Sequence, residues 1–221
     1  MNPASFIDHT LLKPDATAAE IRTLCEEAVE HQFAAVCVPP VHVRQAADLV
    51  YGSEVAVATV IGFPLGYQLP EVKAHEAALA VRQGAGEIDM VIGLGAAREG
   101  LFSQIGADVA GVVRAAAGAK VKVILECCYF TPAEKRKLAE AVLSAGAAWL
   151  KTSTGFGPGG ATLEDVALLL EVSRGRAGVK AAGGIRDWDS CRRFLQLGAS
   201  RIGTSSGVAI LDQWRAAADP C

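Results

Sequence analysis

Hydrophobic and polar positions along the chain alternate between short runs with a strand-like pattern and longer stretches with a helical one. Seven runs are rich in β-branched residues and predict buried strands. They cover residues 34–40, 54–63, 87–93, 121–128, 148–153, 178–184 and 200–205. Stretches rich in Ala, Glu and Leu separate these runs and predict helices, several of which open on Thr, Asp or Pro. The clearest cover residues 16–32, 69–83, 131–145, 162–174 and 186–197.

A short joint recurs where three of these helices lead into a strand. Glycine accepts the left-handed conformation that ends a helix, and the strand follows within a few residues. The joints are Gly84-Ala85, Gly146-Ala147 and Gly198-Ala199. Such regular joints predict a parallel sheet, and residues 5–9 are the best candidate for the eighth strand that would close it. We favour a single-domain (β/α)8 TIM barrel over residues 1–221, because no G-x-G-x-x-G fingerprint of an open, doubly wound sheet follows the first strand.

Composition narrows the class of partner. The 221 residues are 51% hydrophobic, enough for one large core, and the formal net charge is −3 without any run of five like charges. We therefore expect a small molecule as partner, with no nucleic acid and no membrane. No signal peptide or long apolar span is recognised, which predicts a cytoplasmic protein. Six cysteines and four histidines lack metal-ligand spacing, so we expect no metal and no cofactor. The sequence is compatible with a homo-oligomer.

Polar residues at the ends of the predicted strands are the candidates for chemistry, because (β/α) barrels carry their active sites there. These residues are Asp8, Cys37, Asp89, Glu126, Lys151, Lys180, Thr204, Ser205 and Ser206. Side chains alternate along a strand, so apolar neighbours facing the helices leave Asp89, Lys151 and Lys180 facing inward. Adjacent strands lie only about 4.8 Å apart. We therefore expect two lysines and a carboxylate to converge inside the barrel.

Two interpretations of this convergence remain open. A buried ion network could neutralise the lysines through Asp89, Asp8 or Glu126. Alternatively, one lysine is a Schiff-base nucleophile whose pKa, ordinarily about 10.4, falls by about three units through a second ammonium about 6 Å away and partial burial. A carboxylate would then move protons, and Asp89 is well placed to do so. Asp8 is a second candidate, although it is equally suited to capping the turn that follows it.

Glycine-rich loops after the last two strands form a second set of candidates. The backbone amides of Gly183 and Gly184, with the Ser205 and Ser206 groups, are suited to holding phosphate oxygens. The alternative is that these glycines only make tight turns. Residues 155–162, GFGPGGAT, are not a P-loop, because no Gly-Lys-Ser/Thr follows their glycines. We expect them to form a flexible loop over the site.

Six motifs in order carry a resemblance to a known family. They are IDHTLLKPDAT, EIDMVI, KVILE, LKTSTGF, VKAAGGIR and RIGTSSG, between residues 7 and 207. Together they resemble the deoxyribose-phosphate aldolases, a family of metal-free class I aldolases. The pairing of KTSTGF with a downstream KAAGGIR is the most specific part. The resemblance implies reversible cleavage of 2-deoxy-D-ribose 5-phosphate to D-glyceraldehyde 3-phosphate and acetaldehyde, in deoxynucleotide breakdown.

The resemblance also implies roles for individual residues. It assigns the Schiff base to Lys151, the lowering of that lysine's pKa to Lys180 and proton transfer to Asp89, with Asp8 as a supporting polar residue. It implies phosphate contacts from Thr154, Gly155, Gly183, Gly184, Gly203, Ser205 and Ser206.

The chain departs from the family pattern at two internal positions and at its end. Relatives often have Asn where this chain has Gly93 and Thr where it has Cys127. Some relatives have a longer tail with a tyrosine near the substrate. The last ten residues of this sequence, DQWRAAADPC, contain no tyrosine, so a proton step assisted by the tail is in question.

Three alternatives to the Schiff-base aldolase stay open. A non-covalent phosphosugar isomerase or epimerase would use Asp89 as its base, whereas a non-catalytic barrel would only bind a phosphorylated ligand. A class II aldolase would need a metal ion.

Overall fold

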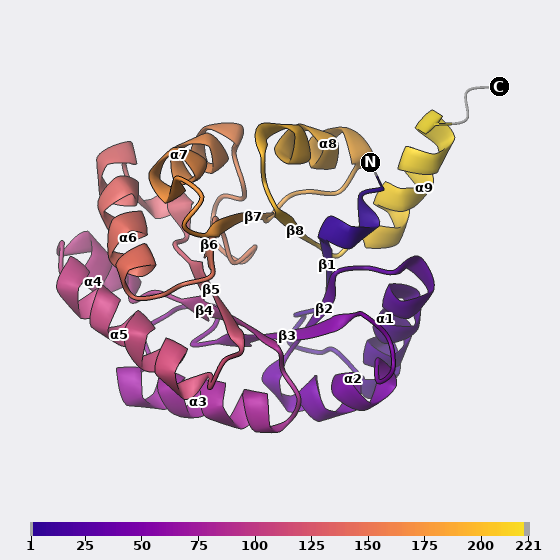
Figure 1. Ribbon diagram of the computed structural model, residues 1–221, viewed down its shortest axis with the longest axis horizontal. Coiled ribbons are helices and arrows are strands. Elements are labelled where there is room, and N and C mark those ends of the chain that lie inside the picture. Colours follow the sequence, from indigo (N-terminus) through magenta and orange to yellow (C-terminus); the bar gives the residue numbers. More distant parts are fainter. Residues whose placement is uncertain (1, 219–221) are drawn as a thin grey trace.

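Eight parallel strands close into a barrel in the computed structural model, which describes residues 2–218 (Figure 1). The strands are β1 (Ile7–Thr10), β2 (Ala35–Val38), β3 (Ala56–Ile61), β4 (Glu87–Val91), β5 (Lys120–Ile124), β6 (Trp149–Lys151), β7 (Gly178–Ala182) and β8 (Arg201–Thr204). Each strand pairs with the next one in sequence, and β8 pairs with β1. The predicted (β/α)8 barrel is therefore confirmed.

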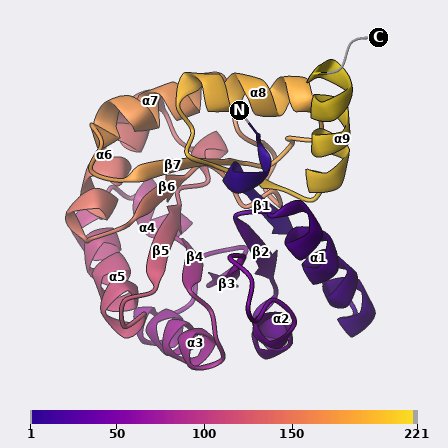
Figure 2. The ribbon, with the colours of Figure 1, turned by 45° about the vertical axis from the view of Figure 1, so that its right-hand side comes forward.

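Helices form a ring around the barrel (Figure 2). They are α1 (Ala18–His31), α2 (Val43–Leu49), α3 (Pro70–Arg82), α4 (Leu94–Arg98), α5 (Phe102–Ala115), α6 (Pro132–Ser144), α7 (Leu163–Ser173), α8 (Trp188–Leu197) and α9 (Gly207–Ala218). The five helices predicted from sequence are all present. Helices α2, α4, α5 and α9 were not predicted; in α5, two interior glycines weaken the helical propensity.

Local signals at the helix ends explain why the predicted helices have these limits. The side chains of Thr17, Thr131, Thr162 and Asp187 each accept a hydrogen bond from a backbone amide in the first turn of a helix. Such N-caps satisfy amides that have no partner within the helix. The three predicted glycine joints have positive φ at Gly84, Gly146 and Gly198. In each case the strand begins three residues after the glycine, as the joint predicts.

Most predicted strands extend one or two residues beyond the observed ones, and two of the limits have a clear local cause. The first strand begins at Ile7, because Ala4–Phe6 form a 3₁₀ turn. The strand predicted over residues 121–128 ends at Ile124. Glu126 then takes a left-handed conformation with φ 51°, and residues 127–129 form another 3₁₀ turn. In physical terms, a turn next to each strand overrides the apolar pattern that suggested a longer one.

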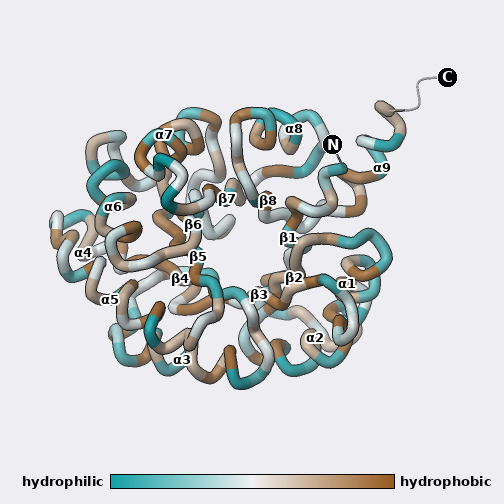
Figure 3. Tube along the Cα trace, viewed as in Figure 1, coloured by the Kyte–Doolittle hydropathy of each residue, from teal (hydrophilic) through white to brown (hydrophobic). Residues whose placement is uncertain are grey.

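The barrel separates two kinds of interior. Outward-facing strand residues pack against the helices in one extensive hydrophobic core. Inside the barrel, small apolar residues gather on β2 and β3, where Ala35, Cys37, Ala58 and Val60 form a separate cluster. The helices alternate between hydrophobic and hydrophilic positions along their length, as amphipathic helices do (Figure 3). No helix within residues 2–218 is long and apolar enough to cross a membrane.

Candidate active site

Asp89, Lys151 and Lys180 meet inside the barrel, as strand alternation predicts. The Nζ atoms of Lys151 and Lys180 both donate to Oδ2 of Asp89, each at 2.7 Å. The strand register places Lys151 directly beside Lys180 on β6 and β7. All three side chains are buried, and the most exposed residue, Lys151, retains only 3% of its surface. Two cations therefore compete for one carboxylate oxygen.

Asp8 also belongs to this cluster. Its Oδ2 accepts a hydrogen bond from Lys180 Nζ at 2.5 Å, and its Oδ1 accepts one from Arg201. The carboxylate thus points into the barrel and does not cap the turn after β1. That turn has backbone hydrogen bonds instead, from the Leu11 amide to the Cys37 oxygen at 3.0 Å and from the Ala16 amide to the Lys13 oxygen at 3.1 Å.

A further group of charges lies against Asp8 and Asp89, and none of its members, Glu87, Lys122 and Arg201, was among the candidates named from sequence. Lys122 Nζ lies 2.6 Å from Glu87 Oε2 and 2.8 Å from Asp89 Oδ1. Arg201 binds both oxygens of Glu87, at 2.9 and 3.0 Å. Glu87 lies two residues before Asp89 on β4, so strand alternation turns it to the same side. The same alternation rule, with Val121 and Val123 facing the helices, would have placed Lys122 in the barrel.

Burial and neighbouring charges act differently on the two lysines. Burial lowers the pKa of Lys151 below its ordinary value; the Lys180 ammonium acts in the same direction, and Asp89 opposes both. Although burial alone would lower it, the pKa of Lys180 is raised by Asp8 and Asp89. Although burial alone would raise it, the pKa of Asp89 is held well below its usual range by Lys122, Lys151 and Lys180. Lys180 therefore stays an ammonium group, whereas Lys151 more readily becomes a neutral amine.

A cavity of about 240 Å³ opens directly above Lys151. Its lining includes Thr154, Gly155, Gly183, Gly184, Gly203 and Ser205, together with Lys13 and Arg186, which the sequence analysis did not single out. Ser206 does not line it; its backbone oxygen accepts a hydrogen bond from Ile210 in α9. Six of the seven predicted phosphate contacts thus surround one cavity.

Three of these glycines have a conformational or steric reason to be there. Gly183 and Gly184 have φ of 91° and 82°, which side chains rarely adopt, so they do turn the chain tightly, as the alternative interpretation requires. A Cβ at Gly203 would lie 3.0 Å from Cε of Lys180. Gly203 therefore also makes room for the buried lysine.

Glu126 has a different role from the one considered for it. Its carboxylate accepts hydrogen bonds from the Thr154 amide at 3.1 Å and from the Thr154 hydroxyl. It is not among the carboxylates paired with the barrel lysines. The left-handed turn at Glu126 directs it toward residues 155–160, where a Cβ on Gly157 would lie 3.1 Å from its carboxylate carbon. Glu126 therefore holds the loop after β6.

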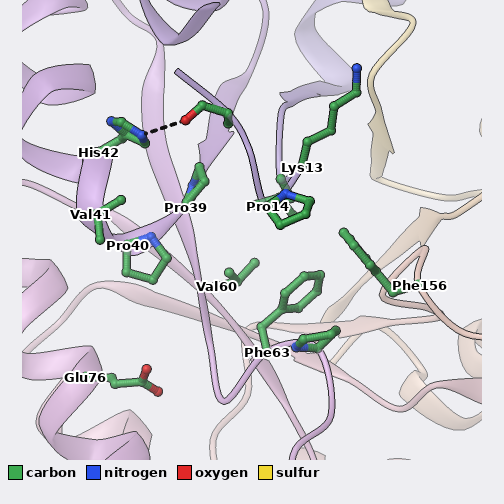
Figure 4. A pocket seen from close by; sticks show the side chains of 13 residues that line it. Lys13, Pro14, Pro39, Pro40, Val41, His42, Val60, Phe63, Glu76 and Phe156 are labelled. Carbon is green, nitrogen blue, oxygen red and sulfur yellow. Dashed lines mark hydrogen bonds between the residues drawn. The ribbon is translucent and has the colours of Figure 1, made fainter. Parts of the chain in front are cut away.

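A second, mainly apolar cavity of about 290 Å³ adjoins the first on the side of β1 to β3 (Figure 4). Leu12, Lys13 and Phe156 line both cavities. Phe156 packs edge-on against Phe63, with ring centroids 5.3 Å apart. This aromatic contact joins the loop after β3 to the loop after β6. The mouth of the barrel is thereby divided into an apolar part and a part lined by glycine amides and cations.

The positions that depart from the family pattern lie outside both cavities. Gly93 caps α4, and Cys127 is buried in the hydrophobic core. The last residues, 219–221, lie outside the described part of the chain. Within residues 2–218, no cluster of three or more His, Cys, Asp or Glu side chains is arranged to hold a metal ion.

Comparison with known proteins gives a consistent result. A family model described as DeoC/LacD family aldolase matches residues 4–213. The deoxyribose-phosphate aldolase of Syntrophotalea carbinolica is 55% identical, over 98% of this chain and 98% of its own length. That of a Thermus thermophilus strain is 54% identical over 96% of both chains. The solved structure of deoxyribose phosphate aldolase from Aeropyrum pernix, described as a unique tetramer, is 36% identical with a TM-score of 0.89, covering 97% of this chain and 91% of its own.

Proposed function

The chain belongs to the DeoC/LacD family of aldolases, and we accordingly propose that it reversibly cleaves 2-deoxy-D-ribose 5-phosphate to D-glyceraldehyde 3-phosphate and acetaldehyde. The observation that carries the proposal is the hydrogen bond that Lys151 and Lys180 each donate to one oxygen of Asp89. Only Lys151 of these three residues lines the cavity. The nucleophile is therefore the lysine that both reaches the substrate and has a lowered pKa.

The cleavage begins when the neutral amine of Lys151 attacks C1 of the open-chain sugar to give a carbinolamine. Loss of water leaves a positively charged imine that can accept electrons. The C3 hydroxyl then loses its proton, the C2–C3 bond breaks, and the bonding pair moves to C2 to form an enamine. D-glyceraldehyde 3-phosphate leaves, C2 takes up a proton, and water releases acetaldehyde and restores the amine.

Asp89 is the proposed centre of the proton transfers. Because its pKa is held low, it is ionised at rest and begins the cycle as a proton acceptor. The Nζ atoms of Lys151 and Lys180, bound to the same Asp89 oxygen, provide a short route for a proton between the reacting nitrogen and the network. Asp8 supports this arrangement by holding Lys180 at 2.5 Å.

The substrate phosphate is proposed to bind on the far side of the same cavity. Gly155, Gly183, Gly184 and Gly203 leave backbone groups accessible there, and Ser205 adds a hydroxyl. Arg186 and Lys13 line this cavity and have no ion-pair partner within residues 2–218. Thr154 is a less direct contact, since its hydroxyl already donates to Glu126. Two unpaired cations suit a doubly charged phosphate.

The non-covalent isomerase remains a weaker alternative. It would use Asp89 as its base without covalent help, which leaves the lowered pKa of Lys151 and its position in the cavity wall without a role. We further propose that the protein acts in the cytoplasm, where the five free cysteines within residues 2–218 stay reduced, and that it forms a homo-oligomer.

A retro-aldol assay tests the proposed activity directly. The protein is incubated with 2-deoxy-D-ribose 5-phosphate, and acetaldehyde release is followed, with ribose 5-phosphate as the control sugar. We expect acetaldehyde only from the deoxy sugar. Tight binding of the sugar phosphate without acetaldehyde release would instead support a non-catalytic binding protein.

A further inference from the structure

We propose that Glu87, Lys122 and Arg201 are positioning residues that make Lys151 the one uncharged lysine of the barrel. Together with Asp8, Asp89 and Lys180 they form a buried network whose charges already balance when Lys151 is neutral. This inference rests on the proposed Schiff-base function and deepens it. None of the three lines the cavity above Lys151. They act on the nucleophile through Asp8 and Asp89.

The contacts show which cation is least compensated. Lys122 has two carboxylate oxygens within 2.8 Å and a third, on Asp8, at 3.8 Å. Arg201 pairs with Glu87 and Asp8, and Lys180 pairs with Asp8 and Asp89. Lys151 has a single carboxylate contact, to an oxygen that it shares with Lys180. Lys151 is therefore the cation that the network holds most weakly.

The charges of the network support the same conclusion. Without Lys151, the barrel interior holds three cations (Lys122, Lys180 and Arg201) and three carboxylates (Asp8, Glu87 and Asp89). A net charge in a poorly hydrated interior is strongly unfavourable, whereas a matched set of hydrogen-bonded ions is tolerated. If Lys151 is a neutral amine, the set is matched; if it is protonated, the set carries one uncompensated positive charge.

Other groups around Lys151 do not alter this balance. From β2, Cys37 faces the cluster, and burial raises the pKa of its thiol to about 11, so it is uncharged at neutral pH. The inward residues of β3, Ala58 and Val60, are apolar. Beneath the network, Trp149 lies 5.9 Å from the Lys122 ammonium and 5.3 Å from the Arg201 guanidinium, and its ring stabilises both cations. The balance therefore depends on the carboxylates and cations already named.

Two substitutions should move the protonation of Lys151 in opposite directions. Lys122→Met leaves two cations against three carboxylates, and protonation of Lys151 then restores neutrality. Its amine should become harder to deprotonate, and the acid limb of the pH profile should move to higher pH. Glu87→Gln leaves a surplus positive charge before Lys151 is protonated, so the limb should move to lower pH. Each shift should be about one pH unit or more, the effect of a unit charge within about 10 Å at an effective dielectric near 20.

The experiment measures kcat/KM for deoxyribose 5-phosphate and borohydride trapping of Lys151 with acetaldehyde from about pH 5 to about pH 10. It compares the unaltered chain, Lys122→Met, Glu87→Gln and the double variant. The double variant should return the acid limb close to its original position. Lys73→Met and Asp108→Asn serve as controls, because they break a buried pair of 2.6 Å outside the barrel. Neither control should shift the profile.

Shifts in the same direction, or no shift in Glu87→Gln, would overturn the inference. Glu87→Gln preserves side-chain size and so tests the inference even if Lys122→Met does not fold. A merely structural role would reduce activity at every pH without opposed shifts. If the unaltered chain neither cleaves the sugar nor traps acetaldehyde at any pH, the proposed function itself fails. An active enzyme with unmoved limbs refutes only the positioning role.

Discussion

Two buried lysine clusters in this protein have similar distances but different consequences. Between α3 and α5, Lys73 lies 2.6 Å from Asp108 and donates to the Val91 backbone oxygen at 3.1 Å. In the barrel, Lys151 lies 2.7 Å from Asp89 but shares that oxygen with Lys180. Lys73 has a carboxylate to itself, and Lys151 does not. A short contact to a buried carboxylate therefore does not distinguish a structural lysine from a reactive one.

The position of each lysine completes the contrast. Lys73 is 1% exposed, lines neither cavity and ties α3 to the end of β4. Lys151 forms part of the wall of the polar cavity. A buried lysine becomes a candidate nucleophile when two conditions hold: it has no carboxylate to itself, and it borders a cavity that a substrate can enter. Each of the following substitutions tests one side of this comparison.

Replacing Lys151 with Ala should have the largest effect. It removes the only amine of the network that reaches the cavity, so kcat should fall by at least about 10⁴-fold, as when a nucleophile is deleted. Steady-state cleavage of deoxyribose 5-phosphate measures the loss, and circular dichroism checks that the barrel is folded. Activity within tenfold of the original (about 1.4 kcal/mol) would remove Lys151 from the mechanism.

Replacing Asp89 with Asn should be the next most severe change. The amide cannot accept a proton in the same way, and a lost general acid–base group reduces the rate by about 10²–10⁴-fold. The defect should appear in kcat, measured at saturating substrate, because Asp89 lies beneath the cavity. A change confined to KM would indicate instead that Asp89 only binds the sugar.

The structural cluster should respond in stability and not in catalysis. Lys73→Met leaves Asp108 charged and buried, and breaking such a pair costs about 3–5 kcal/mol of the free energy of unfolding. Urea denaturation measures this loss, while kcat at a temperature where the variant is folded should change less than about twofold. A large drop in kcat with full folding would contradict the division between the two clusters.

The smallest effect is expected at the rim of the polar cavity. Lys13 is exposed, and its side chain extends away from the apolar residues of the neighbouring cavity (Figure 4). Lys13→Gln should raise KM for deoxyribose 5-phosphate a few-fold with little change in kcat, since it removes one exposed charge near a phosphate. Unphosphorylated deoxyribose should show no change. Lys137→Gln, on the exposed face of α6, is the matched control.

Strand alternation explains how much of the site could be predicted from sequence. Alternate residues of a strand face opposite sides, so the apolar residues that face the helices identify the inward ones. This rule placed Asp89, Lys151 and Lys180 correctly. It did not reach Glu126, whose direction depends on a left-handed turn beyond the end of β5. Lys122 obeys the rule but lies mid-strand, away from the end where chemistry was sought.

Contacts between distant loops lie beyond such patterns. The pairing of Phe63 with Phe156 brings together residues 93 positions apart, and no local periodicity encodes it. The fold itself was more accessible, because helix caps and glycine joints repeat around the barrel and agree with one another. Helix α5 escaped detection, since its interior glycines oppose the helix that its packing against the barrel stabilises.

The most direct test of the central claim is to identify the lysine that forms the Schiff base. The protein is treated with acetaldehyde and borohydride at neutral pH, digested, and its modified peptide is identified by mass spectrometry. The account predicts a reduced adduct on Lys151, with Lys180, Lys122 and Lys73 unmodified. An adduct on Lys180 or Lys122, or no adduct in a protein that cleaves the sugar phosphate, would contradict it.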